Sequence, residues 1–436
     1  MSRNVQQAAK SASRTPLRIL LCGATLSGNM GAQAMYLTMV DDLHSLTDPL
    51  DVTVLSKYPD DDRPHCKALG WNMVSFPTMV QLSLGVPLSI AFWICRSLHL
   101  PAAWISRSRI APYADHDILI DLSGISFTDD RPISGLLINC LWLVPALSTG
   151  IPFVKASQAM GPFRKLPVRL AARFFLSRAS SLIARGPISA RHLQALLPHN
   201  RVYQLPDVAF ALKPVPDDQV MKVLREAGLD EDEAYCILGP SYVVESAMSG
   251  KQAGNRYADL MAIAADQLTA LSGLRIILVP HERSHKRSSY DDLKVCESVI
   301  ERMKNPQRVL LLRGNLSAPL LKGIIGGGQV AIGSRFHFMV AALSSGVPSL
   351  AIGWSHKYAE MMQMLGQQTF AVSHEEIDEA TFVSAVHRLW SDREPIREEI
   401  ACRLPGILQA ASSNAAVSLR AIIKAGCSSN ETGINP

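Results

Sequence analysis

Residues 330–357 read VAIGSRFHFMVAALSSGVPSLAIGWSHK, and this stretch decides the fold class. Val330–Ile332 and Ser349–Ile352 have the composition of short buried strands, and Phe336–Ser345 between them has the pattern of a helix. A strand, a helix and a second strand in this order form a βαβ unit, whose two strands lie parallel in one sheet. The stretch therefore predicts an α/β architecture.

Short apolar runs alternate with helical patterns along most of the chain. Strands are expected at Arg18–Cys22, Asp51–Leu55, Ile118–Leu122, Phe153–Ala156, Ser181–Ala184, Val202–Leu205, Tyr235–Leu238, Arg275–Val279 and Val309–Leu312, besides the two named above. Helices are expected at Ala32–Leu46, Leu166–Ser177, Ser189–Leu197, Tyr257–Ser272 and Tyr290–Met303 as well. Repeated units of this kind predict two Rossmann-like, doubly wound domains that face a cleft.

The chain has 436 residues, which is too many for one hydrophobic core and fits two domains. A polar, proline-bearing break at 214–218 marks the boundary. We expect a disordered tail (1–16), an N-terminal Rossmann-like domain (17–213), a C-terminal Rossmann-like domain (214–393) and a C-terminal helical segment with a tail (394–436). The C-terminal helical segment could cross back to the first domain.

Bulk composition narrows the ligand and the compartment. Hydrophobic residues make up 48% of the chain and charged residues 19%, as in folded globular proteins. The formal net charge of +5 includes no long Lys/Arg run, so we expect a small anionic ligand and no nucleic acid. The eight cysteines are scattered without a CxxC pair, which favours reduced thiols in a cytosolic protein over disulfides or a zinc site.

Two apolar stretches, Met79–Ile105 and Pro132–Val154, are long enough to span a bilayer. We expect both to be core helices of an α/β domain. The alternative for Met79–Ile105 is a membrane-facing hairpin or surface helix that makes peripheral contact. The start of the chain lacks a secretory cleavage site, so we expect a cytoplasmic protein or, on the alternative, one at the inner face of the cytoplasmic membrane.

Cations gather at the start of the helix that follows Val330–Ile332. Ser334 is the expected N-cap, which places Arg335 and His337 in the first turn of that helix. A cation at a helix N-terminus is unfavourable by a few tenths to about 1 kcal/mol, and a bound anion would offset that cost.

The next helix is expected to repeat this pattern. Ser355 is its expected cap, and the helix opens with His356 and Lys357. Ligands bind at the carboxyl ends of the strands in doubly wound sheets. Two neighbouring helix starts with cations therefore predict one anion site.

Other polar residues also follow predicted strands. Gly31 and Asn29 lie in a turn without the GxGxxG spacing, where Asn29 could bind a ligand hydroxyl or hold the turn. Asp121 could orient sugar hydroxyls, act as a base or cap its loop. Arg185 could line the cleft or form a salt bridge, and His281 could transfer protons or be a hydrogen-bonded loop histidine.

An ordered set of short motifs resembles the polysaccharide pyruvyl transferase family. The segment GSRFH…AALSSGVPSLAIGWSHKY is similar to the family's C-terminal signature. Further matches are the turn at 28–31, the block at 117–124, the element at 157–162, Ala184 with Arg185, and 205–207. Together they cover roughly residues 17–370.

This resemblance implies a GT-B-like fold with the acceptor on the N-terminal domain and the donor on the C-terminal domain. It implies transfer of the pyruvyl group of phosphoenolpyruvate onto two hydroxyls of a saccharide as a cyclic ketal, with release of phosphate. The family's Arg-x-His and strand-end arginine, which are associated with the donor, correspond to Arg335, His337 and Arg185.

The chemistry of phosphoenolpyruvate agrees with these residue types. Its carboxylate and phosphate call for cations, and we expect Arg335, Arg185 and Lys357, with Ser334, to bind the donor. His337 is the expected proton-transfer group and His281 the second candidate.

The acceptor is expected at Asn29, Gly31 and Asp121. It is a saccharide or a lipid-linked oligosaccharide. Phosphoenolpyruvate is a co-substrate, and neither a metal nor another cofactor is expected.

Two other functions compete with this one. A nucleotide-sugar glycosyltransferase of the same architecture often has a glutamate where Ala341 stands, so Ala341 favours a donor without ribose. A non-catalytic scaffold in polysaccharide assembly would release no phosphate and would bind through Met79–Ile105.

Overall fold

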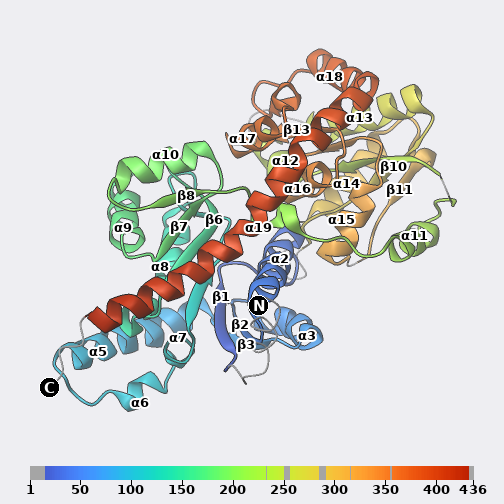
Figure 1. Ribbon diagram of the computed structural model, residues 1–436. Helices are drawn as coiled ribbons and strands as arrows, with labels where there is room; N and C mark the ends of the chain where they lie inside the picture. Colours follow the sequence, from blue (N-terminus) through green and yellow to red (C-terminus); the bar gives the residue numbers. More distant parts are fainter. Residues whose placement is uncertain are drawn as a thin grey trace, which may run out of the picture.

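The computed structural model describes residues 15–231, 233–249, 256–283, 291–314, 316–353 and 356–431. The side chains of residues 356 and 423–431 are outside this description, as are residues 1–14 of the predicted tail and Ser355, the expected cap. Figure 1 shows two α/β domains and one long helix that runs across both.

The first domain is built on an all-parallel sheet. Its strands are β1 (Leu17–Cys22), β2 (Leu50–Ser56), β3 (Asn72–Ser75), β4 (Ile118–Asp121), β5 (Ile125–Thr128), β6 (Phe153–Gly161), β7 (Ser181–Ala184) and β8 (Val202–Gln204). Their order is β3-β2-β1-β4-β6-β7-β8, and β5 pairs with β6. The strand order changes direction between β1 and β4, which creates a crevice at their carboxyl ends.

The second domain repeats this plan. Its strands are β9 (Tyr235–Gly239), β10 (Arg275–Leu278), β11 (Val309–Leu311), β12 (Ala331–Gly333), β13 (Ser349–Gly353) and β14 (Ala371–Ser373). They pair in parallel in the order β11-β10-β9-β12-β13-β14, with the reversal between β9 and β12. The prediction of two doubly wound domains is confirmed, and residue 214, the expected boundary, lies between the two sheets.

Helices cover both sheets. In the first domain they are α2 (Met30–Leu46), α3 (Pro59–Leu69), α4 (Thr78–Val80), the π-helix η1 (Gln81–Gly85), α5 (Val86–Ser97), α6 (Ala103–Ser106), α7 (Ala111–Ala114), α8 (Ile133–Thr149), α9 (Leu166–Leu176), α10 (Pro187–Leu196) and the 3-10 helix η2 (Val208–Ala211). The others are α11 (Asp217–Glu226), α12 (Tyr242–Ser249), α13 (Arg256–Ser272), α14 (Asp292–Arg302), η3 (Pro306–Arg308), α15 (Ala318–Gly326), α16 (Phe336–Ser344), α17 (His356–Met364), η4 (Gln368–Phe370), α18 (Glu379–Ser391) and α19 (Arg393–Glu431).

Helix α19 connects the two domains. It leaves the second domain after α18 and packs on α2 and η2 of the first (Figure 1). Its buried Asn414 donates from Nδ2 to the Pro206 carbonyl at 3.1 Å, and Ser412 Oγ lies 3.2 Å from Asp42 Oδ1. The helical segment therefore crosses back to the first domain.

The two faces of the first sheet have different cores. Ile19 and Leu21 of β1 belong to one continuous apolar core that extends through α2 and α19 into the second domain. Leu20 and Cys22 alternate with them and face a separate core, which Trp142 of α8 and residues of α9 and α10 complete. Side chains in a strand alternate between faces, so one apolar strand serves both cores.

The prediction that Met79–Ile105 forms core helices is wrong. Thr78–Ser97 is a continuous helix on the surface. Only 17% of its most apolar 18-residue stretch is buried. Among the described residues it is the one helix with the length and mean hydropathy, 1.6, to cross a membrane. An apolar sequence does not by itself distinguish a buried helix from one with an exposed apolar side.

Strands β3, β5 and β14 were not predicted either. Each has three or four residues. The edge strands β3 and β14 are only partly buried, so their sequences lack the apolar runs that mark the central strands.

Candidate active site

A cleft of about 470 Å³ lies between the carboxyl edges of the two sheets. Its walls come from the segments that follow β1, β2, β4, β5, β7, β9, β10, β12 and β13. Each half of the cleft is therefore the crevice that the strand order creates. The predicted residues that line it are Asn29, Arg185, His281, Arg335, His337 and Lys357. The other three, Gly31, Asp121 and Ser334, do not line it.

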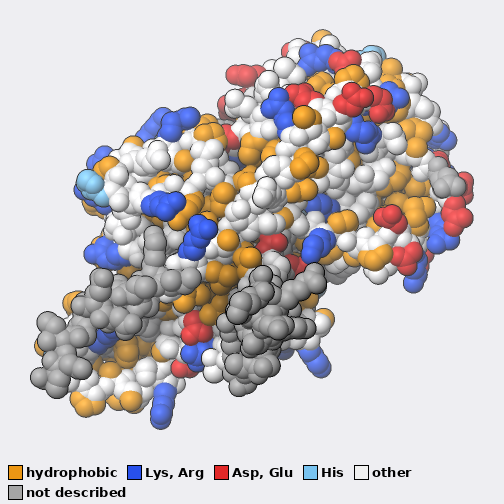
Figure 2. Space-filling view, in the orientation of Figure 1, with side chains coloured by type: hydrophobic (Ala, Val, Ile, Leu, Met, Phe, Trp, Pro, Cys, Tyr) orange, Lys and Arg blue, Asp and Glu red, His pale blue; other side chains and the backbone are white. Residues whose placement is uncertain are grey.

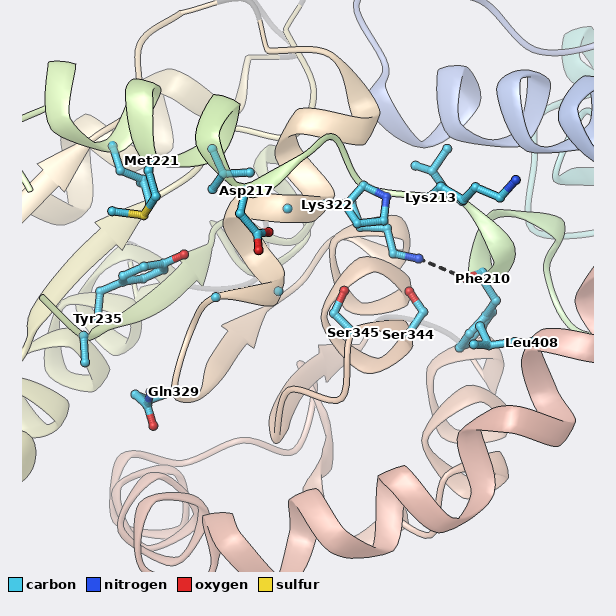
Figure 3. Close-up of a pocket in the computed structure, with 18 of the residues that line it drawn as sticks. Phe210, Lys213, Asp217, Met221, Tyr235, Lys322, Gln329, Ser344, Ser345 and Leu408 are labelled. Carbon is cyan, nitrogen blue, oxygen red and sulfur yellow. Dashed lines mark hydrogen bonds between the residues drawn. The ribbon is translucent and has the colours of Figure 1, made fainter. Parts of the chain in front are cut away.

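A larger cavity, about 1170 Å³, opens on the opposite side of the second domain (Figure 3). It lies beside Tyr235 at the start of β9 and Gln329, before β12, where strands begin rather than end. Lys322 is its buried cation, and Lys322 Nζ donates to the Phe210 carbonyl at 3.0 Å (Figure 3). This cavity contains none of the predicted site residues.

Arg335 is already neutralised by the protein. Its guanidinium donates to Asp292 Oδ1 at 2.6 Å and Oδ2 at 2.9 Å, and to Glu282. Burial alone would lower the pKa of Arg335, but Asp292 and Glu282 raise it above its ordinary value. The expectation that a bound anion offsets this cation therefore needs correction, because two carboxylates supply the negative charge.

Ser334 is not the N-cap of α16. The cap residue is Arg335, which has extended backbone angles and no capping side-chain bond. Ser334 is fully buried, and its hydroxyl receives a hydrogen bond from Tyr257 Oη at 2.7 Å. Its carbonyl accepts from Tyr358 Oη at 2.7 Å. Ser334 therefore holds the turn between β12 and α16 from the buried side, away from the cleft. This position contradicts the expectation that Ser334 binds the donor.

Arg185 lines the cleft and forms a salt bridge as well. Its Nη1 lies 2.7 Å from Asp207 Oδ2, and its guanidinium stacks on the Phe336 ring at 4.1 Å. Nε and Nη2 are buried and have no hydrogen-bond partner in the described part of the chain. Buried donors without partners are unfavourable by about 1–3 kcal/mol, so these atoms favour a bound acceptor.

Further cations surround Arg185. Lys357 is buried, and burial together with Arg185 and Arg131 holds the pKa of its amine well below the ordinary value. Burial and Arg131 likewise lower the pKa of Lys57. We call Lys57, Arg131, Arg185 and Lys357, all of which line the cleft, the cation cluster.

Two members of this cluster were not predicted as site residues. Lys57 follows β2, and Arg131 lies at the exposed rim between β5 and α8. In the sequence, the one feature that marks them is that each follows a strand. Many polar residues share this feature, so it does not identify them as site residues.

His337 lies between groups from the first domain. Its Nε2 is 3.6 Å from Asp207 Oδ2, an ion-pair distance that is long for a hydrogen bond. Asp207 is fully buried. Burial alone would raise its pKa, but His337 and Arg185 lower the pKa well below the ordinary 3.8. Asp207, which was not predicted as a site residue, is therefore an anion that connects both.

His281 is buried beside His337 and Arg335. Burial, His337 and Arg335 together hold its pKa well below the ordinary 6.5. The ring is therefore neutral at physiological pH, and a neutral imidazole can accept a proton.

The two residues of the first turn have structural roles. A Cβ on Gly31 would lie 2.1 Å from His337 Nδ1, so Gly31 makes room for that ring, and it does not line the cleft. Asn29 caps α2 by accepting from the Ala32 amide at 3.0 Å, which is the turn-holding alternative. It also pairs with Glu282 of the second domain at the cleft wall.

Asp121 lies below the cleft. Its Oδ2 is 2.6 Å from Lys155 Nζ, and both side chains are fully buried. Oδ1 accepts from the Ser123 amide at 2.9 Å and from Gln158 Nε2 at 3.0 Å. This arrangement is the loop-capping alternative, and it leaves the carboxylate no access to an acceptor.

A known protein family matches most of this chain. The model described as polysaccharide pyruvyl transferase matches residues 29–356. The chain belongs to the polysaccharide pyruvyl transferase family. The matched range contains every predicted site residue of this pyruvyl transferase family member except Lys357. A curated relative, the amylovoran biosynthesis protein AmsJ of Erwinia amylovora, is 21% identical over 411 residues, which cover 88% of this chain and 95% of AmsJ.

Solved structures of low identity share the fold of this family member. UDP-GlcNAc 2-epimerase from Neisseria meningitidis, bound to UDP-GlcNAc, is 8% identical with a TM-score of 0.59, covering 94% of this chain and 100% of that one. Anabaena Alr3699/HepE, in complex with UDP-glucose, is 13% identical with a TM-score of 0.56 and the same coverage. The predicted GT-B-like arrangement is confirmed by these likenesses.

Proposed function

We propose that this protein transfers the pyruvyl group of phosphoenolpyruvate onto two hydroxyls of a saccharide as a cyclic ketal. The observation that carries the proposal is the cation cluster, in which two buried nitrogens of Arg185 have no partner in the described part of the chain. Arginine pairs with a carboxylate or a phosphate through two parallel hydrogen bonds. A donor in the cleft would satisfy Arg185 and relieve the mutual repulsion of the cations.

Arg335 has a different role in this proposal. Its charge is matched by Asp292 and Glu282, but a guanidinium has five N–H donors. The four contacts to these carboxylates use one N–H of each nitrogen, because Nε–H is shared between both oxygens of Asp292. We assign it the orientation of the donor through its remaining N–H groups, while the net positive charge comes from the cation cluster.

The proton transfers fall to the two histidines. The methylene carbon of the donor takes one proton, and the acceptor hydroxyls lose two. One of these two protons replaces the proton given to the carbon, and the other leaves on phosphate as the C–O bond to phosphate breaks. His337, with the Asp207 anion beside it, would protonate the carbon, and the neutral His281 would accept a hydroxyl proton.

The acceptor and the setting are part of the same proposal. Of the three predicted acceptor residues, Asn29 alone lines the cleft. We propose a saccharide or a lipid-linked oligosaccharide as acceptor, in exopolysaccharide or cell-envelope glycan biosynthesis in the cytoplasm. The likeness to AmsJ, a protein named for amylovoran biosynthesis, supports such a process. The balanced reaction requires no cofactor other than phosphoenolpyruvate as co-substrate.

The test is phosphate release from phosphoenolpyruvate with lipid-linked precursors, together with the mass gain of a pyruvyl ketal on the acceptor. Arg185→Gln should lower kcat/KM for phosphoenolpyruvate by about 100-fold, since a bidentate ionic contact is lost. Arg185→Lys should fall between, because it keeps the charge without the fork. Arg225→Gln, in an exposed ion pair far from the cleft, is the matched control. Unchanged kcat/KM in Arg185→Gln would exclude this donor site.

A nucleotide-sugar glycosyltransferase is the second candidate, favoured by the fold shared with proteins that hold UDP-sugars. Ala341 on α16 offers no carboxylate for a ribose. Thermal stabilisation separates the two candidates, since only a ligand that binds the native state raises the Tm. Stabilisation by UDP- or CMP-sugars but not by phosphoenolpyruvate would favour the glycosyltransferase. An absence of phosphate release with every acceptor would favour a scaffold.

A further inference from the structure

The first domain has a helical layer with large apolar side chains on its outward side. Met79 is 74% exposed, Trp93 58% and Trp104 68%, on α4, α5 and α6. Such residues are uncommon on the surface of a domain that has no partner on that side.

The same layer continues across α8 and α9. Helix α5 packs on α8, and α8 packs on α9. Leu166, Leu170 and Phe174 are each at least half exposed and recur every fourth residue along α9, while Val168 and Ala172 face the core. Residues four apart share one side of a helix, so α9 has an apolar stripe that points outward. We call the outward sides of α4–α6, α8 and α9 the apolar face.

The helices that form this face carry charge of one sign. No aspartate or glutamate occurs in residues 63–114 or 131–206, the two segments that carry these helices. Arg169 and Arg173 are exposed on α9 beside its apolar stripe. Figure 2 shows apolar and basic side chains together over the parts of the first domain where α6 and α9 lie in Figure 1.

The helix Thr78–Ser97 lies on the domain instead of standing apart from it. Gln81 and Ser89 on its inner side are buried, and Arg96 Nη1 donates to the Thr149 carbonyl of α8 at 2.9 Å. A helix held in this way presents one side outward, which suits insertion into the surface of a bilayer rather than a crossing.

We propose that the apolar face binds the surface of an anionic phospholipid bilayer. Tryptophan and leucine side chains enter the interfacial region, and the neighbouring arginines pair with phosphate headgroups. A protein partner of ordinary composition is disfavoured, because the face offers no carboxylate with which that partner's cations could pair.

The apolar face meets the rim of the cleft. Ile133, 65% exposed on the first turn of α8, follows the rim residue Arg131 by two positions. Asp129 in the same loop accepts from the amides of Arg164 at 2.7 Å and Lys165 at 3.1 Å, which joins the rim to the start of α9. Bilayer binding on this face would bring the cleft to the membrane surface. The further step, that a lipid-linked acceptor enters there, rests on the proposed function.

Vesicle co-sedimentation of the full chain tests the inference. Vesicles of phosphatidylcholine alone should bind weakly, and those with about a third phosphatidylglycerol should bind at least tenfold more tightly, with a decrease at high salt. Trp93→Ser with Trp104→Ser, and separately Arg169→Glu with Arg173→Glu, should each weaken binding at least tenfold. Leu271→Ser, at an exposed leucine of the second domain, should leave it unchanged.

Three outcomes would overturn the inference. They are an absence of binding to either vesicle, equal binding by all variants, and a dimer in sedimentation equilibrium that Trp93→Ser with Trp104→Ser dissociates. Circular dichroism and thermal midpoints confirm that each variant folds. Phosphate release with a short soluble saccharide separates the two proposals, because it should persist in the variants that no longer bind vesicles. Its absence in wild type with intact vesicle binding would count against the proposed function alone.

Discussion

At the scale of single residues, the cleft depends on groups that hold the ionisable side chains rather than on those side chains alone. Gly31 of the first domain leaves the space that the His337 ring of the second domain occupies. Asp207 carries negative charge between His337 and Arg185. A small change in either supporting residue therefore alters the position or the electrostatic environment of a histidine that touches the cleft.

Gly31→Ala should reduce turnover without removing donor binding. The new Cβ would lie 2.1 Å from His337 Nδ1, so the ring must move, at a stability cost of about 1–3 kcal/mol. We expect kcat for phosphate release to fall at least tenfold and KM for phosphoenolpyruvate to change less. Gly406→Ala, on α19, meets no atom within 4 Å and is the control. A wild-type kcat in Gly31→Ala would show that the ring position is unimportant.

His281 should make the folded protein sensitive to mild acid. Its folded pKa lies well below 6.5, so the unfolded chain binds the proton first, and stability is lost as pH falls below 6.5. Between pH 7.5 and 5.5, wild type should lose about 1 kcal/mol more than His281→Gln in urea unfolding. His44→Gln, at a half-exposed histidine, should behave like wild type. Equal losses in wild type and His281→Gln would contradict the burial of a neutral ring.

At the scale of elements, helix starts are held in place by carboxylates from other helices. Asp292, in the first turn of α14, accepts from Arg335 at the start of α16 and from the amides of Tyr242 at 2.9 Å and Glu282 at 2.8 Å. One buried carboxylate therefore connects three loops at the carboxyl edge of the second sheet.

Asp292→Asn should destabilise the second domain strongly. Arg335 would keep Glu282 as its only strong anionic partner among the described residues, and breaking a buried ion pair costs about 3–5 kcal/mol. Glu231→Gln removes an exposed partner of Arg225 and should cost under about 1 kcal/mol. Urea unfolding measures both, and similar small effects would mean that Arg335 is not stabilised by Asp292.

At the scale of the whole molecule, helix α19 and the cleft are coupled through one loop. Asn414 of α19 donates to the carbonyl of Pro206, which directly precedes Asp207. A second contact between the domains is the hydrogen bond from the Ala318 amide to Gln33 Oε1 at 2.6 Å, buried beneath the cleft. A shift of α19 relative to the first domain would therefore move the loop that holds the Asp207 carboxylate next to His337.

Asn414→Ala should therefore lower activity from a distance. Loss of a buried hydrogen bond leaves the Pro206 carbonyl with one donor fewer, at a cost of about 1–3 kcal/mol. Phosphate release should fall severalfold because the loop that carries Asp207 becomes less restrained. Gln409→Ala, on the exposed side of α19, should change neither stability nor activity. The coupling is absent if both variants retain the wild-type rate.

The sequence by itself determined the two parallel sheets and the sheet edge at which most of the predicted site residues gather. Arg185, His281, Arg335 and Lys357 each follow an apolar strand, and the carboxyl ends of parallel strands converge, so local patterns were enough to bring them to one cleft. Tertiary structure alone decided which carboxylate pairs with each arginine. Asp207 is distant along the chain from Arg185, and Asp292 is distant from Arg335. It also decided exposure, since hydropathy does not say whether a neighbouring element covers an apolar side.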